Sequence, residues 1–141
     1  MPEFGASIEI ERPPEDVWRA LGTPERWFDG YLETLLRSPD YPAPGTRDDH
    51  LYRTRRSEEV RVGVTRSEAP RVLEEDQEGQ TFARHVRYSV TPSAKGTSLR
   101  VEDEVEFKGL AKLAAPIASR DIKKRWETSL ERLKAAAEGG P

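Results

Sequence analysis

The side chains best placed to do chemistry in this sequence are an arginine and an aspartate that share apolar faces with their neighbours. Residues 97–108 alternate between apolar and charged side chains, and Asp103 falls on the apolar side with Leu99 and Val101. A carboxylate on an apolar face is costly unless it finds a counter-charge or takes up a proton. The sequence offers Arg84 as that counter-charge, so the two residues predict a buried polar anchor.

The preceding strand-like segment brings this arginine close to the aspartate. Its apolar face carries Phe82, Arg84, Val86, Tyr88 and Val90. An antiparallel register that pairs Val90 with Leu99 puts Val86 opposite Asp103, with Arg84 and Tyr88 as diagonal neighbours. The same register places opposite charges on the other face: Arg87 opposite Glu102 and His85 opposite Glu104.

Two interpretations of this anchor remain open. Arg84, Asp103 and Tyr88 could orient the polar group of a mostly apolar ligand, as small-molecule pockets require. The alternative is a structural ion pair, or a bend in the sheet that lets Asp103 reach solvent.

A second candidate is His50, which shares one face of residues 47–55 with Tyr52. If the chain turns at residues 56–58, both side chains sit on the inner face beside Val64 and Val62. A histidine there could act as a general base or hydrogen-bond a ligand carbonyl, and the alternative is a structural histidine. The sequence leaves open the alternative that the opposite face of residues 47–55 points into the cavity.

Other kinds of site find little support. Only two histidines are present, without a second ligand at a recognisable spacing, and there is no cysteine, so we expect no metal and no cofactor. The arginines at 53, 55, 56, 61 and 66 are interspersed with acids in a chain of net charge −3. This pattern favours a solvated sheet face over a nucleic-acid surface.

The elements that must position these residues follow an α+β order. We predict a first strand at 6–12, short helices at 14–21 and 24–28, and a long closing helix at 110–138 that Pro116 kinks or starts. Six further strands follow from the period of two, at 31–37, 47–55, 59–67, 70–76, 80–91 and 97–108. Short connections make this seven-stranded sheet antiparallel. A closing helix on a curved sheet implies a cavity between them.

Further candidates line this cavity. Trp27 and Tyr31 lie where the helical corner meets the sheet, at one end of the cavity, and could line its entrance. In the closing helix, Leu113 and Ile117 lie on a different stripe from the later apolar residues, so we expect them to lid the cavity.

Length and composition predict one domain. The chain has 141 residues and a mean hydropathy of −0.80, which suits a single domain over 1–138 with a flexible tail at 139–141. No segment is apolar enough for membrane insertion and no signal peptide is evident, so we expect a cytoplasmic protein. Its oligomeric state, monomer or dimer, is left open.

The opening stretch, residues 8–21, resembles the start of SRPBCC (START-like) proteins, which include polyketide cyclase/dehydrase-like and birch-pollen-allergen-like members. Later landmarks agree: Pro44-Gly45-Thr46, Ala69-Pro70, residues 96–99 and residues 130–134. The resemblance implies a helix-grip fold with a hydrophobic cavity and no shared catalytic residue. It favours a carrier or sensor of a small hydrophobic or amphipathic molecule. The alternatives are a cyclase or dehydratase acting on an enclosed polyketide-like substrate, and a protein-interaction module.

Overall fold

A single curved antiparallel sheet organises the computed structural model, which describes residues 3–139. The strand order is β1-β7-β6-β5-β4-β3-β2, so β1 and β2 form the two edges. The strands are β1 (Glu3–Ile10), β2 (Tyr31–Arg37), β3 (Asp48–Tyr52), β4 (Glu58–Glu68), β5 (Val72–Glu78), β6 (Phe82–Ser93) and β7 (Gly96–Phe107). The helical elements are α1 (Pro14–Leu21), η1 (Pro24–Arg26), η2 (Gly109–Ala114) and α2 (Ala115–Glu138).

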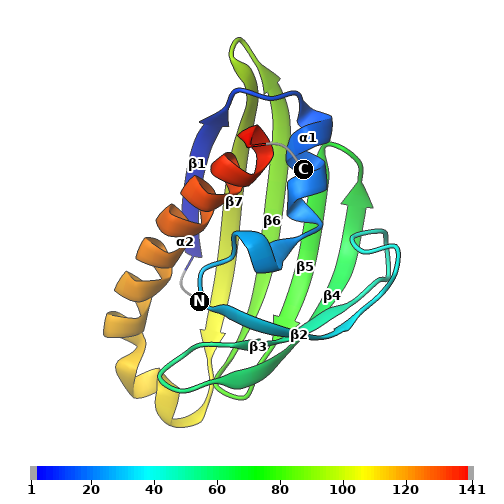
Figure 1. Ribbon diagram of the computed structural model, residues 1–141. Helices are drawn as coiled ribbons and strands as arrows, with labels where there is room; N and C mark the ends of the chain where they lie inside the picture. Colours follow the sequence, from blue (N-terminus) through cyan, green and yellow to red (C-terminus); the bar gives the residue numbers. More distant parts are fainter. Residues whose placement is uncertain (1–2, 140–141) are drawn as a thin grey trace.

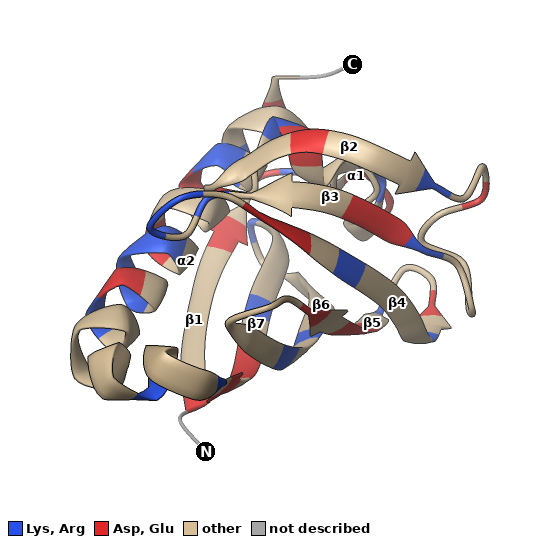
Figure 2. Cartoon of the chain, turned by 90° about the horizontal axis from the view of Figure 1, so that it is seen from below, with Lys and Arg blue, Asp and Glu red and all other residues tan. Residues whose placement is uncertain are grey.

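The sheet curves around its helices, as the α+β helix-grip prediction required (Figure 1). β2 and β3 cross one end of the sheet, and α2 runs along the opposite edge beside β1. Seen from below, the strands wrap around the inner side on which α1 and α2 lie (Figure 2). From Ile122 onward, α2 is anchored by buried side chains at helical spacing: Ile122, Trp126, Ser129, Leu130, Leu133 and Ala137.

The helix boundaries follow local rules. Pro14 starts α1, and the acidic residues of its first turn lie where the helix dipole favours negative charge. α2 begins at Ala115, so Pro116 lies in its first turn, where a missing backbone N–H costs nothing. The predicted closing helix therefore divides into η2 and α2. Of the predicted tail, residues 140 and 141 lie outside the described residues.

The register of β6 and β7 confirms the alternation argument. Val90 pairs with Leu99, and Val86 pairs with Asp103. His85 lies opposite Glu104 and Arg87 opposite Glu102, as predicted. The His85 imidazole, however, turns to β5, which flanks β6 on its other side and supplies two carboxylates. The His85 ring nitrogens lie 2.6 Å from Asp76 Oδ1 and 2.8 Å from Glu74 Oε1.

β3 is shorter than predicted and its register differs. His50 and Tyr52 do lie on the inner face, at 2% and 4% exposure. They pair with Val60 and Glu58, however, because the β3–β4 connection spans residues 53–57 and is longer than the three-residue turn expected.

Candidate functional site

Aromatic rings fill the space between the sheet and α2. Phe28 lies between Tyr52 and Trp126, with ring centroids 5.5 and 5.4 Å away. Tyr88 is edge-on to both Trp27 and Trp126, at 6.1 and 6.0 Å. The cavity expected from the sequence is thus largely occupied by side chains. Beside Tyr88 a small space of about 10 Å³ remains, close to the least that one water molecule needs.

The predicted polar anchor lies at the centre of this interior. Arg84 Nε is 3.5 Å from Asp103 Oδ2, and their side chains are 4% and 0% exposed. The same oxygen accepts a 2.8 Å hydrogen bond from Trp126 Nε1. The sequence argument assigned Trp126 to packing alone and so missed this third member of the anchor, which joins β6, β7 and α2.

The surroundings of Arg84 keep its guanidinium charged. Burial is the largest single influence and opposes the charged form, but Asp103, together with Tyr52 and Tyr88, outweighs it, so the pKa of Arg84 is raised above its ordinary value. Its guanidinium carbon also lies 5.0 Å from the ring centroid of Phe82 and 5.8 Å from that of Tyr52. These distances suit cation–π attraction, which is stronger where water is excluded.

The anchor does not use all of its hydrogen-bonding capacity. Arg84 Nε and Asp103 Oδ1 are buried without a hydrogen-bond partner in the described part of the chain, and so is His50 Nε2. Native interiors satisfy nearly all buried polar groups, so each exception calls for an explanation. Arg84 Nε is a free donor and Asp103 Oδ1 a free acceptor within one ion pair. Together they could bind a ligand group, such as a hydroxyl, that both accepts and donates a hydrogen bond.

The sequence argument missed a second polar cluster, on the inner face of β5. Glu75 is 3% exposed and accepts a hydrogen bond from the Tyr41 hydroxyl. Burial raises the pKa of Glu75 to about 7, against the hydrogen bond from Tyr41, which lowers it. The small space beside Tyr88 is also lined by Glu75, Gln77 and His50. The alternation of Leu73, Glu75 and Gln77 is the signal that could have revealed this face.

His50 belongs to a third polar cluster, in which it contacts Asp48 and Tyr31. Its Nδ1 lies 3.2 Å from the Asp48 backbone oxygen, and the Tyr31 ring stacks on the imidazole at 4.1 Å. Burial opposes the charged form of Asp48, but His50 and Arg37 prevail and hold its pKa below the ordinary value. Burial raises the pKa of Tyr31 to about 12. These contacts favour the carboxylate form of Asp48, whereas burial favours the protonated form of Glu75.

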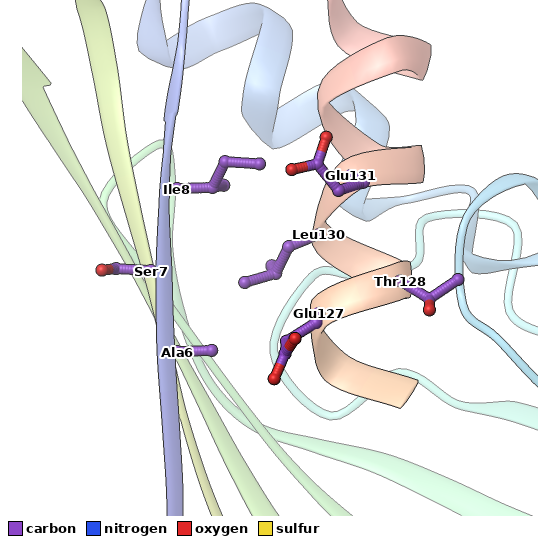
Figure 3. A pocket seen from close by; sticks show the side chains of 7 residues that line it. All are labelled: Ala6, Ser7, Ile8, Glu127, Thr128, Leu130 and Glu131. Atoms are coloured by element: carbon purple, nitrogen blue, oxygen red, sulfur yellow. The ribbon is translucent and has the colours of Figure 1, made fainter. Parts of the chain in front are cut away.

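A groove of about 360 Å³ lies outside this interior, between β1 and α2 (Figure 3). Ala6 and Ile8 of β1 face Leu130 of α2, while Glu127 and Glu131 stand at the rim. None of the predicted site residues lines it. The groove opens to solvent, and a small-molecule site usually encloses most of its ligand.

The structure separates the predicted site residues into two groups. The interior residues are Trp27, His50, Tyr52, Phe82, Arg84, Tyr88, Leu99, Val101 and Asp103, all buried, with Tyr31 half-buried beside them. The lid prediction is wrong, because Leu113 and Ile117 are 82% and 68% exposed and lie before the part of α2 that packs on the sheet. Within residues 3–139, no three histidine, aspartate or glutamate side chains are grouped to hold a metal. The same residues contain no helix long and apolar enough to cross a membrane.

The fold and its polar, aromatic interior define the class of helix-grip proteins. The chain belongs to the family described as polyketide cyclase/dehydrase and lipid transport, whose sequence model matches residues 1–138. A comparison with curated protein sequences finds no match.

Solved structures show the same fold at low sequence identity. The chain is similar to TTHA0849 from Thermus thermophilus, with 17% identity, a TM-score of 0.79 and 98% of each chain covered. It is similar to MLL2253 from Mesorhizobium loti, with 21% identity, a TM-score of 0.74 and 99% of each chain covered. Ara h 8.0201 matches with 11% identity, a TM-score of 0.73 and 99% of each chain covered. At these identities the likeness concerns the fold alone.

Proposed function

We propose that this protein binds a small, mostly apolar molecule between the sheet and α2, and that Arg84 and Asp103 hold its polar group. The observation that carries this proposal is the pair of unpartnered atoms, Arg84 Nε and Asp103 Oδ1, inside an aromatic interior. A ligand hydroxyl can accept from the arginine and donate to the aspartate, which satisfies both atoms at once.

The aromatic rings supply the apolar part of this site. Phe28 and Tyr52 stack at an interplanar angle of 16°. Phe82 meets Tyr52 edge-on, and Trp126 is tilted at 43° to Phe28. A flat ligand ring can replace these ring–ring contacts with similar ones, so we propose that the ligand is aromatic. It enters the interior as the aromatic side chains change rotamer. The family description, which names polyketide cyclases and lipid transport, supports a ligand of this kind.

A pair of probes that differ by one hydroxyl tests the proposal. We expect 1-naphthol to bind at least tenfold more tightly than naphthalene, measured by quenching of tryptophan fluorescence. In Arg84→Lys the charge stays but the planar fork is lost, so the ratio should fall below threefold. Arg87→Lys, on the exposed side of the same strand, is the control and should keep the wild-type ratio. Absence of saturable binding by either probe would contradict the proposal.

Glu75 favours a second candidate function, proton transfer of the cyclase or dehydratase type. Its carboxyl group has a pKa of about 7 and borders the same small space as Tyr88 and His50. A general acid or base works best when its pKa lies near the working pH.

Deuterium exchange measures this activity without a known substrate. If Glu75 transfers protons, the protein should accelerate exchange at the activated carbon of 2-tetralone in D₂O, followed by NMR. Glu75→Gln should then lose about a hundredfold of that acceleration, as is typical for removal of a general base. An unchanged rate in Glu75→Gln would exclude this role, and Glu59→Gln, an exposed carboxylate, is the control.

A further inference from the structure

We propose that the end of the molecule formed by η2 and the first turns of α2 docks on an anionic lipid surface. Three large aliphatic side chains are exposed there: Leu110 at 86%, Leu113 at 82% and Ile117 at 68%. Leu110 and Leu113 are three residues apart in a 3₁₀ helix, and Ile117 follows one α-helical turn later, so the three share one side. We call these three residues the aliphatic stripe.

Basic side chains surround the aliphatic stripe. Residues 108–125 contain six lysines and arginines and one acid, Asp121, in a chain whose net charge is −3. The basic residues are Lys108, Lys112, Arg120, Lys123, Lys124 and Arg125. Lys112, Arg120, Lys123 and Lys124 are exposed, and no residue from 109 to 121 is buried. Positive charge is therefore concentrated at one end of an acidic protein.

The β3–β4 loop adds to this positive charge. Arg53, Arg55 and Arg56 are exposed on that loop. Arg125 Nη1 donates a hydrogen bond to the Arg53 backbone oxygen, which holds the loop against α2. Figure 2 shows the blue loop beside the blue segments of the helix.

Acids near the loop and helix must be counted against this charge. Asp29 is already paired with Arg53 and Arg132, at 3.6 and 3.4 Å. Glu127 stands farther along α2, at the rim of the β1–α2 groove. Lys108 is paired with Glu78, at 2.9 Å. The positive charge available to a partner is therefore that of Lys112, Arg120, Lys123 and Lys124, which are exposed.

Exposed aliphatic side chains flanked by lysine and arginine complement a membrane interface, which has an apolar acyl-chain region and a layer of charged headgroups. The aliphatic groups enter the boundary of the acyl chains, and the cations attract anionic headgroups. Charge complementarity thus selects an anionic bilayer over a neutral one. This surface lies apart from the interior site, so the inference does not depend on the proposed ligand.

Vesicle sedimentation tests the proposal with the whole chain. We expect binding to vesicles of phosphatidylcholine with 30% phosphatidylserine at low salt, and at least tenfold weaker binding to pure phosphatidylcholine or in 0.5 M NaCl. Replacing the aliphatic stripe, L110S/L113S/I117S, or its cations, K112Q/K123Q/K124Q, should each weaken binding at least tenfold. These side chains are exposed, so the variants should fold as the wild type does, which circular dichroism checks.

Two matched controls distinguish binding through this surface from nonspecific hydrophobic adsorption and from nonspecific electrostatic attraction. L32S/L35S/L36S removes the exposed leucines of the edge strand β2, and R61Q/R87Q/R100Q removes three exposed cations elsewhere on the sheet. Both should bind as the wild type.

Equal binding to neutral vesicles, or equal loss in the controls, would overturn the proposal. So would concentration-dependent dimerisation that L110S/L113S/I117S abolishes, since a second copy would then cover the stripe. Unchanged 1-naphthol binding in that variant would show that the interior site is separate.

Discussion

Replacing Arg84 with methionine is expected to lower the free energy of unfolding by about 3–5 kcal/mol. The methionine removes the only cation paired with Asp103 among the described residues, and the aspartate is 1% exposed. An unpaired carboxylate must then remain in the interior or take a proton from solvent, and either outcome costs stability. Arg87→Met, on the exposed face of the same strand, should change the unfolding free energy by less than about 0.5 kcal/mol.

A double-mutant cycle identifies the ion pair as the cause. Asp103→Leu alone leaves Arg84 buried without its partner, but Arg84→Met with Asp103→Leu removes both charges. We expect the double variant to be at least about 2 kcal/mol more stable than the sum of the single effects predicts. Part of the loss should persist, because Trp126 Nε1 also loses its acceptor.

Urea unfolding of the wild type and the three variants measures this coupling. Adding Trp126→Phe to the double variant removes the unpartnered indole N–H, and it should cost less there than in the wild type. Additive effects of Arg84→Met and Asp103→Leu, within about 0.5 kcal/mol, would mean that the two side chains do not interact. The proposed polar anchor would then have to be abandoned.

The second large effect concerns Glu75 and pH. Its pKa is about 7 in the fold, against an ordinary value of 4.5. The folded state therefore holds the proton more tightly than the unfolded chain does. The resulting stabilisation is fully present below pH 4.5 and is lost as the pH rises to about 7. The difference amounts to about 3 kcal/mol, at about 1.36 kcal/mol per pKa unit.

Comparison with Glu75→Gln isolates this contribution. Glutamine does not titrate, so the stability of the wild type relative to this variant should fall by about 3 kcal/mol between about pH 4.5 and pH 7.5. Asp48, whose pKa is lowered, acts in the opposite direction, but it is present in both proteins and cancels. Glu59→Gln, which alters an exposed carboxylate, should follow the wild type at every pH. A constant difference between wild type and Glu75→Gln would show that the fold does not raise the pKa of Glu75.

Alternation along the strands was enough to predict most of the fold and half of the site. Side chains in a strand point to opposite faces with a period of two, so the faces of β6 and β7 could be assigned from sequence. Opposite charges on the outer faces then selected one register, and the structure has that register. The approach of Arg84 to Asp103 follows from it, because diagonal neighbours on one face lie within reach of a long side chain.

Contacts across the core could not be predicted in this way. Periodicity assigns Trp126 to the buried side of α2, but its hydrogen bond to Asp103 depends on how the helix lies on the sheet. In the sequence Glu75 is one acid among several, and only the fold brings Tyr41, from a distant loop, to cover it.

The sequence determined which residues share a face, and the tertiary structure decided what each face meets. Local backbone geometry sets side-chain periodicity, so the inner faces of the strands and the anchored stripe of α2 could be assigned from sequence alone. Helical spacing also placed Leu113 and Ile117 on one face of the predicted closing helix, and we expected that face to cover the cavity. In the fold η2, which carries Leu113, and the first turns of α2, which carry Ile117, leave both side chains facing solvent. Docking of the helix depends on the packing of its part from Ile122 onward, to which no local pattern in residues 110–117 contributes.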